Sequence, residues 1–328
     1  MTKLFVYNYR DFDEAEPFAR YAKQYGVELG FCPDPPSIEN ADLAKGYPSI
    51  SIITTRMDRL LLAKLAQNGV RMISTRTIGY DHIDLEAAKE FGLMVSNATY
   101  SPHCVADYTV MLMLMCIRKT KRIMERASVN DFTLPGIQGR ELKNFTVGII
   151  GTGKIGRTVL QNLSGFGCKL YAYDIIESKE AKQYAEYLPF EELLQRCDML
   201  SLHLPLSDST RHLINLNAIS RMKDGVILIN TARGGLIDTT ALINNLENGK
   251  IGAAGLDVIE NEFGLYYFDH KADILKNREL SILRGFPNVV VTPHMAFYTD
   301  QAIDDMVHHS ILSCVSREKG EDDLWKVL

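Results

Sequence analysis

The fold of this chain is decided by the stretch VGIIGTGKIG, residues 147–156. Three of its four glycines, Gly151, Gly153 and Gly156, have GxGxxG spacing, follow an apolar run and open a helical pattern over residues 157–163. At this spacing the first glycine permits a tight turn, and the second lets the backbone approach a pyrophosphate. The third brings the helix close to the strand, and the free amides at the start of the helix face the anion. The stretch therefore predicts the phosphate-binding turn of a dinucleotide fold.

An acidic residue ends the next predicted strand. Asp174 follows the run KLYAY, residues 169–173, at the distance expected in a dinucleotide fold. A carboxylate at this place accepts hydrogen bonds from the ribose hydroxyls of adenosine and repels a 2′-phosphate, which favours NAD over NADP. A plain glycine turn followed by a strand-end cap would give the same local pattern, so the prediction depends on further motifs.

Composition excludes several classes of function. The 328 residues are too many for one typical core and indicate about two domains. The formal net charge of -5, with both signs mixed along the chain, offers no basic stripe, so we expect no nucleic-acid partner. The six cysteines are scattered without a CxxC pair, which is typical of buried thiols in a reducing compartment. No group of histidines and cysteines has metal-ligand spacing, so we expect no metal.

No segment of the chain is predicted to enter a membrane. The most apolar run, residues 108–117, has about half the length of a membrane helix and is followed by Arg118 and Lys119. The first residues lack the basic, apolar and small-residue regions of a signal peptide. We therefore expect a cytoplasmic protein without a membrane partner.

Strand-like and helix-like runs alternate along most of the chain, a rhythm typical of βαβ units and parallel sheets. The rhythm breaks at NATYSP, residues 97–102, where a single long helix is predicted over about residues 105–125. It resumes with the strand at residues 146–150 and continues to the strand at 289–291. A last helix is predicted from about Thr299.

We predict an α/β fold of two Rossmann-like or flavodoxin-like parallel-sheet domains with a cleft between them. The dinucleotide domain, residues 101–296, would be inserted into the other domain. That second domain would consist of residues 1–100 together with 297–328, completed by the C-terminal helix.

Three further segments stand at the ends of predicted strands, where open α/β sheets place their ligands. These segments are INTARGG (229–235), GLDVIENE (255–262) and VTPHMA (291–296). An arginine between such turns can present its planar fork to a carboxylate. A histidine suits proton transfer near neutral pH, and an acidic neighbour would keep it protonated and oriented. Each segment alone also has a structural interpretation, as a salt bridge, an acidic loop or a satisfied histidine.

Together, these motifs resemble the D-isomer-specific 2-hydroxyacid dehydrogenase family. The run GTGKIG, Asp174, NTARGG, GLDVIENE and TPHMAFYT is similar to the D-lactate dehydrogenase branch, including the enzymes of vancomycin-resistance clusters. The segments RTIGYDHID, NATYSPHCVADYT and GLYYFDHK match that branch in order and spacing, so the resemblance covers nearly the whole chain.

The resemblance implies a mechanism in which NADH reduces a 2-oxo acid and three residues are catalytic. His294 would be the acid/base, Glu262 its carboxylate partner, and Arg233 the residue that binds and polarises the substrate carboxylate. Glu262 is preferred to Glu260 because the family's residue lies five positions after the aspartate of DV, here Asp257.

The resemblance also implies two sets of binding residues. Those for the dinucleotide are Gly151, Gly153, Lys154, Ile155, Gly156, Asp174, His203, Leu204, Pro205, Thr210, Thr231, Ala232 and Asp257, the last near the nicotinamide carboxamide. Those for the substrate are Ile78 and Gly79 through their amides, Tyr100 and Tyr298, which would close the pocket, and Ile53.

Ile53 departs from the pattern, since several related lactate enzymes have an aromatic residue over the substrate side chain there. The expected reaction is pyruvate to D-lactate, and bulkier substrates such as phenylpyruvate or 4-methyl-2-oxopentanoate remain open. Phe297 and Met306 would line the same pocket or belong to the core. A non-catalytic NAD-sensing corepressor and a phosphoglycerate-type dehydrogenase are weaker alternatives. The family further implies a homodimer formed through the dinucleotide domain, with residues 108–117 in its interface.

Overall fold

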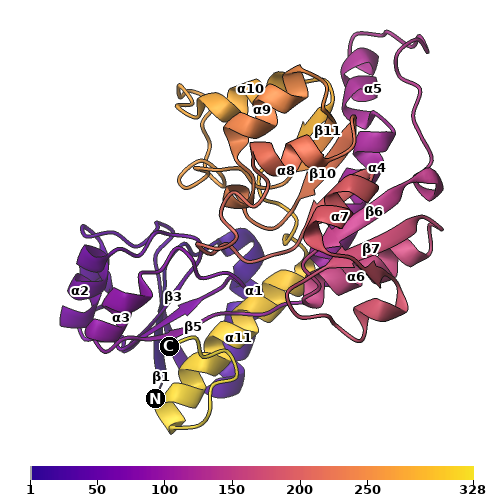
Figure 1. Ribbon diagram of the computed structural model, residues 1–328. Helices are drawn as coiled ribbons and strands as arrows, with labels where there is room; N and C mark the ends of the chain where they lie inside the picture. The colour runs from indigo at the N-terminus through magenta and orange to yellow at the C-terminus, as the bar shows by residue number, and fades with distance from the viewer. Residues whose placement is uncertain (1) are drawn as a thin grey trace. The chain divides into compact units, whose positions relative to one another are not determined.

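The computed structural model describes residues 2–328, which form two compact units (Figure 1). Unit 1 combines the segment that ends at Ser101 with Tyr298–Leu328, and unit 2 is Pro102–Phe297. Both predicted boundaries, after residues 100 and 296, differ from this division by one residue. Each unit contains one sheet whose strands are all parallel, so the prediction of two parallel-sheet α/β domains is confirmed.

Unit 1 is a five-stranded sheet with helices on both faces. Its strands are β1 (Thr2–Val6), β2 (Val27–Phe31), β3 (Ser49–Ile52), β4 (Met72–Thr75) and β5 (Met94–Ser96), in the order β2-β1-β3-β4-β5. Its helices are α1 (Asp11–Tyr25), α2 (Arg59–Gln67), α3 (Leu85–Glu90), α11 (Asp300–Lys319) and the 3-10 turn η1 (Ala41–Ala44). This strand order is that of flavodoxin-like folds, in which ligands bind at the carboxyl ends of the strands.

The core of unit 1 follows from the two-residue period of its strands. Leu4 and Val6 of β1 pack with Phe18 of α1 and residues of α11, whereas Phe5 packs on the opposite face with α2 and α3 residues such as Leu62. One strand therefore contributes to both hydrophobic layers, as is typical of a sheet covered on both faces.

The C-terminal tail lies against β5, the edge strand of this sheet. Val327 donates its amide to the Val95 carbonyl at 2.8 Å, and Ser96 and Lys326 form an antiparallel bridge. The indole Nε1 of Trp325 donates to Thr99 Oγ1 at 3.0 Å. The tail thus covers the open edge of the sheet and holds the loop that follows β5.

Unit 2 is a seven-stranded sheet in the order β12-β11-β10-β9-β6-β7-β8. Its strands are β6 (Thr146–Ile150), β7 (Lys169–Tyr173), β8 (Glu186–Tyr187), β9 (Met199–Leu202), β10 (Val226–Asn230), β11 (Ile251–Leu256) and β12 (Val289–Val291). Its α-helices are α4 (His103–Ile117), α5 (Thr120–Ala127), α6 (Lys154–Ser164), α7 (Phe190–Arg196), α8 (Leu216–Arg221), α9 (Thr239–Glu247) and α10 (Arg278–Gly285). Three 3-10 turns complete it: η2 (Leu142–Asn144), η3 (Ala181–Gln183) and η4 (Gly234–Leu236).

The strand order of unit 2 is that of a dinucleotide-binding Rossmann fold, with β6 at the point where the order reverses. One hydrophobic layer packs α7 to α10 against the sheet, and the other packs α4 and α6 against it. The glycine turn of residues 151–156 joins β6 to α6 at the centre of this sheet.

Two features of the local structure differ from the prediction. The helix expected over residues 105–125 is two helices, because the backbone at Lys119 turns into the left-handed region with φ 54° between α4 and α5. The edge strands β2 and β8 were not predicted. In β2 the missing side chain of Gly30 leaves room for the rings of Phe5 and Tyr47, so the strand lacks a continuous apolar pattern.

Candidate active site

The glycine turn between β6 and α6 has the geometry of a phosphate-binding loop. Gly151 has φ 96°, and a Cβ atom there would lie 2.6 Å from the carbonyl oxygen of His203. A Cβ atom on Gly156 would lie 1.9 Å from the carbonyl oxygen of Gly151. A Cβ atom on Gly153 would meet nothing within 4 Å, so this side of the loop is open. The first and third glycines close the turn, and the second leaves space for a ligand.

The start of α6 offers hydrogen-bond donors to that open side. No side chain caps the helix at Gly153, and the first amides of a helix have no partner within it. The exposed Lys154 is the first helical residue. This donor set and the positive end of the helix dipole fit a pyrophosphate.

Asp174 lies at the end of β7 and is fixed by the same loop. Its Oδ2 accepts hydrogen bonds from the amide of Thr152 at 2.6 Å and from its hydroxyl at 3.1 Å. The hydroxyl of Tyr187 in turn donates to Thr152 Oγ1 at 2.7 Å. A carboxylate so oriented beside a phosphate-binding turn fits the adenosine ribose of NAD. The residues of unit 2 therefore fit a dinucleotide at this edge of the sheet.

The segment after β9 forms the neighbouring wall of the loop. The amide of His203 donates to the Ile150 carbonyl at 2.7 Å, and its Nε2 lies 2.9 Å from Ser201 Oγ. Burial lowers the pKa of His203 to about 3, so its ring is neutral near pH 7. Leu204 and Pro205 continue this wall, and the Thr210 hydroxyl donates to the Pro205 carbonyl at 2.7 Å.

The turn after β10 presents Arg233. The buried Asn230 shapes it: its Oδ1 accepts the amide of Ala232 at 3.0 Å, and its Nδ2 donates to the Arg233 carbonyl at 2.8 Å. A Cβ atom on Gly234 would lie 2.0 Å from the carbonyl carbon of Ile259, so only glycine allows this close approach. The buried Thr231 is anchored to α4, since its hydroxyl lies 2.8 Å from that of Thr109.

Asp257, at the end of β11, organises the loop that carries His294. Its Oδ1 accepts hydrogen bonds from the Thr292 hydroxyl at 2.6 Å and the Met295 amide at 2.8 Å, and its Oδ2 accepts the Ala296 amide at 2.8 Å. Asp257 is fully buried, and this burial raises its pKa. The structure thus gives Asp257 a definite role in holding the loop, in addition to the cofactor role that the family resemblance implies.

His294 and Glu262 form a hydrogen-bonded pair. Nδ1 of His294 lies 2.7 Å from Oε1 of Glu262, and Oε2 of Glu262 accepts the amide of Ile259 at 3.0 Å. Within residues 2–328, Nε2 of His294 has no hydrogen-bond partner. Glu260 points elsewhere, because its Oε1 lies 2.7 Å from Nε2 of His212. The structure therefore brings Glu262, rather than Glu260, to His294.

In unit 1, the predicted substrate residues follow the ends of β3, β4 and β5. The carbonyl of Ile78 accepts a hydrogen bond from Asn97 Nδ2 at 2.8 Å, and the carbonyl of Gly79 accepts one from the Thr77 hydroxyl at 2.6 Å. Across the part of the chain described, the amides of Ile78 and Gly79 donate to no acceptor. Tyr100 lies beside Thr99, which the C-terminal tail holds.

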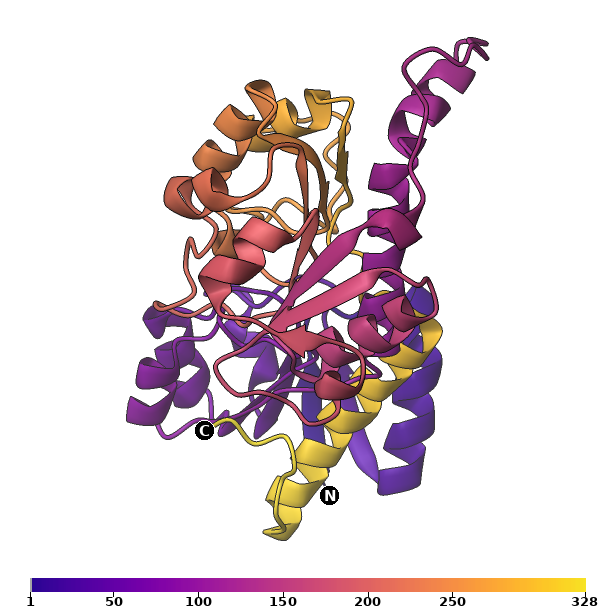
Figure 2. The ribbon, with the colours of Figure 1, turned by 45° about the vertical axis from the view of Figure 1, so that its right-hand side comes forward.

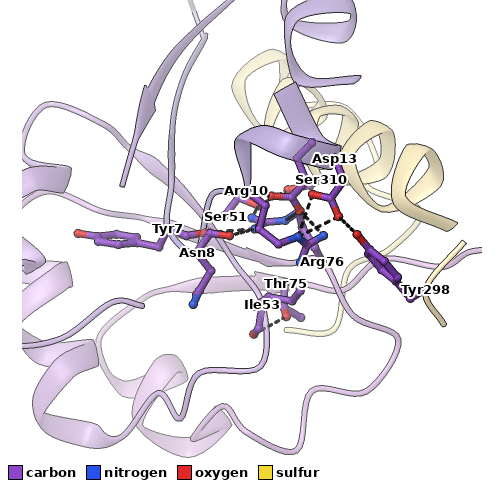
Figure 3. Close-up of polar contacts among 11 residues, drawn as sticks. Tyr7, Asn8, Arg10, Asp13, Ser51, Ile53, Thr75, Arg76, Tyr298 and Ser310 are labelled. Carbon is purple, nitrogen blue, oxygen red and sulfur yellow. Dashed lines mark hydrogen bonds and ion pairs between the residues drawn. The ribbon is translucent and has the colours of Figure 1, made fainter. Parts of the chain in front are cut away.

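A buried polar cluster lies beside Ile53 and Tyr298 (Figure 3). The Tyr298 hydroxyl donates to Oδ2 of Asp13 at 2.8 Å, and Arg10 Nε donates to Oδ1 of Asp13 at 2.9 Å. Burial and the hydrogen bond to Asp13 raise the pKa of Tyr298, so its hydroxyl keeps its proton near neutral pH. Ile53 is buried, and its carbonyl accepts the Thr75 hydroxyl at 3.3 Å.

The centre of this cluster is a fully buried ion pair. Arg76 Nε lies 3.0 Å from Oε1 of Glu14, and Arg76 Nη1 donates to Ser51 Oγ at 2.9 Å. Ser51 Oγ lies 2.7 Å from Ser310 Oγ on α11. Removing one partner of such a pair leaves an uncompensated buried charge, so the pair fixes β3, β4, α1 and α11 together.

Several site residues were not identified from the sequence. Thr292 and Asn230 lie next to predicted residues. A short polar side chain after a strand does not indicate which hydrogen-bond partner it has, so neither was predicted. Asp13 and Arg76 lie far apart in the sequence, and only the tertiary structure brings both into the cluster beside Tyr298. Phe297 lies in unit 2, and its ring meets that of His294 edge-on, with centroids 6.4 Å apart. Met306 is a buried residue of α11, so the structure places it in the core.

The described residues contain neither a metal site nor a membrane-spanning helix. Among residues 2–328, no group of three or more histidine, cysteine, aspartate and glutamate side chains could hold a metal ion. None of the helices in that range is long and apolar enough to span a membrane.

Comparison with known proteins agrees with this geometry. Residues 110–296 match the family described as "D-isomer specific 2-hydroxyacid dehydrogenase, NAD binding domain". The chain is 43% identical over 314 residues to an aromatic 2-oxoacid reductase of Clostridium sporogenes, with 95% of each chain covered. It is 42% identical over 311 residues to a D-specific alpha-keto acid dehydrogenase of Enterococcus faecium, covering 94% of this chain and 95% of that one.

The solved structures lead to the same family. The pyruvate reductase of Chlamydomonas reinhardtii is similar with a TM-score of 0.90 and 35% identity, over 99% of this chain and 98% of that one. The family predicted from the sequence motifs is confirmed, and so is NAD as the cofactor. This chain belongs to the D-isomer specific 2-hydroxyacid dehydrogenase family and is an NAD-dependent oxidoreductase.

Proposed function

We propose that this enzyme reduces a 2-oxo acid to a D-2-hydroxy acid, with His294 as the proton donor. The observation that carries the proposal is the 2.7 Å contact between Nδ1 of His294 and Oε1 of Glu262. The carboxylate is placed to accept the Nδ1 proton and fixes the orientation of the ring. Nε2, the ring nitrogen without a partner in residues 2–328, then holds the proton for the carbonyl oxygen of the substrate.

Each further residue has a separate proposed task. Arg233 binds the substrate carboxylate, since its planar fork matches two carboxylate oxygens. The main-chain amides of Ile78 and Gly79 also donate hydrogen bonds to the substrate carboxylate. Tyr100 and Tyr298 contact the substrate. Asp257 holds the His294 loop in place.

The proposed cofactor site uses the turn and walls described above. The amides at Gly153, Lys154, Ile155 and Gly156 bind the pyrophosphate, and Asp174 binds the adenosine ribose. The remaining contacts are proposed for Gly151, His203, Leu204, Pro205, Thr210, Thr231, Ala232 and Asp257. NAD, in its reduced form, supplies the hydride.

Pyruvate is the first candidate substrate, which would make the product D-lactate. The similarity of the fold to the pyruvate reductase of Chlamydomonas reinhardtii supports this choice. Aromatic 2-oxo acids are the second candidate. The aliphatic side chain of Ile53 and the 43% identity to an aromatic 2-oxoacid reductase favour them.

NADH oxidation, followed by absorbance, tests the proposal. The substrates are pyruvate, 2-oxobutyrate, 4-methyl-2-oxopentanoate, phenylpyruvate and oxaloacetate, with NADPH in parallel. A maximum of kcat/KM at pyruvate supports a lactate dehydrogenase, and a maximum at phenylpyruvate supports the second candidate. Chiral chromatography must identify the D product. His294→Ala should lower turnover by about 10²–10⁴, as loss of a general acid does; near-normal turnover would remove His294 from the mechanism.

We further propose that two copies associate through unit 2. The helix α5 has no buried residue, and it and the following loop extend from the rest of unit 2 (Figure 2). Exposed apolar side chains gather on this arm and nearby: Met111, Ile123, Met124, Val129, Phe132, Leu134 and Phe166. A groove of about 520 Å³ lies at its base, lined by residues of α4 and α6. A cluster of exposed apolar side chains is typical of an interaction site. In a symmetric dimer, each copy contributes the same apolar surface to the interface.

Light scattering after size-exclusion chromatography measures the association. Wild type should have the mass of a dimer, and Met124→Lys with Phe132→Lys should shift it to a monomer that keeps the far-UV circular dichroism spectrum of wild type. A monomeric wild type would contradict the proposal. The six cysteines form no disulfide bond in the part of the chain described, which supports a reducing compartment such as the cytoplasm.

A further inference from the structure

The main chain at His294 adopts an unusual conformation. Its φ is 54°, in the left-handed region that side chains other than glycine rarely adopt. Such conformations persist only when the surrounding structure determines them. The contacts of the His294 peptide groups therefore decide where its imidazole lies.

Most of these contacts come from Asp257. Its carbonyl accepts the His294 amide at 2.8 Å, and its carboxylate accepts the amides of Met295 and Ala296. These bonds fix the N–H groups of the loop. The carbonyl of His294 is bound from another direction, because the hydroxyl of Tyr267 donates to it at 2.7 Å.

Tyr267 belongs to the same loop as Glu262. The amide of Leu265 donates to the Glu262 carbonyl at 3.0 Å, and Tyr267 itself has φ 71°. One loop thus reaches His294 twice, at the ring through Glu262 and at the main chain through Tyr267. The ring of Tyr267 also meets that of Phe297 edge-on, with centroids 6.1 Å apart.

We propose that Tyr267 is a positioning residue for the proton donor: its hydrogen bond to the His294 carbonyl keeps the left-handed peptide, and hence the imidazole, aligned with Glu262. The inference rests on the proposed role of His294. Without the hydroxyl, the peptide group that joins His294 to Met295 keeps only the hydrogen bond to Asp257, and the ring spends less time in the orientation that transfers a proton. Small errors of alignment at a reacting group reduce turnover strongly, whereas binding of substrate is less affected.

The neighbouring tyrosine provides a matched control. Tyr266 packs against the hydrophobic layer of α7 to α10, and its buried hydroxyl has no hydrogen-bond partner within residues 2–328. Tyr267→Phe removes a hydroxyl that bonds His294, while Tyr266→Phe removes one that bonds nothing. The two variants change the loop by the same single atom.

The test compares wild type, Tyr267→Phe and Tyr266→Phe with the best substrate of the panel. For Tyr267→Phe we expect kcat to fall about five- to tenfold, the effect of one lost hydrogen bond. KM and the Kd for NADH, measured by fluorescence, should stay within about twofold, because groups that bind substrate and cofactor are unchanged. Tyr266→Phe should match wild type in all three quantities. An unchanged kcat in Tyr267→Phe, or an equal fall in Tyr266→Phe, would overturn the proposal.

A spectroscopic measurement tests the positioning role of Tyr267 independently of the proposed reaction. In the ¹⁵N-labelled enzyme, the Nδ1 proton of His294 bonded to Glu262 should give a downfield signal that His294→Gln lacks. Tyr267→Phe should shift or broaden that signal, and Tyr266→Phe should leave it in place. If the wild type reduces none of the substrates, the proposed function fails, while the signal still reports whether Tyr267 orients His294. An unmoved signal in Tyr267→Phe would overturn the positioning role even in an active enzyme.

Discussion

Oε1 of Glu262 lies 2.7 Å from Nδ1 of His294, and Oε2 of the same carboxylate is held by the amide of Ile259 at 3.0 Å. One oxygen of Glu262 thus anchors the side chain to its own loop, and the other is directed at the imidazole. A carboxylate fixed in this way does not need to reorganise when the ring gains or loses a proton. The pair can therefore hold a proton at a set place beside the substrate.

Glu262→Gln should reduce kcat by about tenfold or more, yet less than loss of His294 itself, because the neutral amide can still bond the ring but more weakly than the charged carboxylate. Steady-state kinetics with the best substrate measure the effect. Glu260→Gln is the control, since Glu260 bonds His212 instead. Equal losses in both variants would show that general loop damage, rather than loss of the hydrogen-bonded pair, lowers the rate.

Arg233→Lys should mainly weaken use of the 2-oxo acid. Lysine keeps the positive charge but loses the planar fork, which we expect to lower kcat/KM by about 10- to 100-fold. The Kd for NADH should change little. Kinetics with the best substrate, together with fluorescence titration of NADH, check both statements. A variant with normal kcat/KM would mean that another residue binds the carboxylate.

Asp174→Ser should weaken NADH binding and reduce the preference of the enzyme for NADH over NADPH. Loss of hydrogen bonds to a charged group corresponds to roughly 10- to 100-fold in Kd, and the carboxylate no longer repels a 2′-phosphate. Fluorescence titration with both cofactors measures the ratio. Glu177→Gln removes an exposed carboxylate of the same loop and should leave the ratio unchanged. Unchanged NADH affinity in Asp174→Ser would contradict the cofactor site.

The titration of His203 should lower the free energy of unfolding of the cofactor-free enzyme in mild acid, relative to neutral pH. Burial lowers the pKa of His203 to about 3, whereas an unfolded histidine titrates near 6.5. Between these values the unfolded chain binds more protons than the folded one, so the free energy of unfolding falls as the pH drops. The maximum slope from one such group is about 1.4 kcal/mol per pH unit.

Urea unfolding of wild type and His203→Gln at pH 7.5 and 5.0 tests this. The difference in unfolding free energy between the two pH values should be smaller in the variant, because glutamine does not titrate. Comparison within each protein removes the contribution of the other titrating groups. The same pH dependence in both proteins would mean that His203 does not carry the effect.

The class of the fold and the reaction of the family were predictable from residue patterns alone. The motifs that led to this prediction are local patterns: the GxGxxG spacing, Asp174, and the segments around Arg233, Glu262 and His294. Each has a physical cause that acts within a few residues, namely a tight turn, a strand end or a helix N-terminus. The central strands were predictable for the same reason, because a strand buried on both faces is a continuous apolar run. The edge strands β2 and β8 lack that pattern and were missed.

Which side chains meet follows from the packing of the folded chain. The choice between Glu262 and Glu260 followed from family spacing, but their contacts with His294 and His212 depend on how the loop after β11 folds. The bond from Tyr267 to the His294 carbonyl and that from Tyr298 to Asp13 join residues distant in the chain. Hydrogen bonds of this kind depend on distances of a few tenths of an ångström between packed elements. No residue pattern records such distances, because they result from the packing of the whole unit.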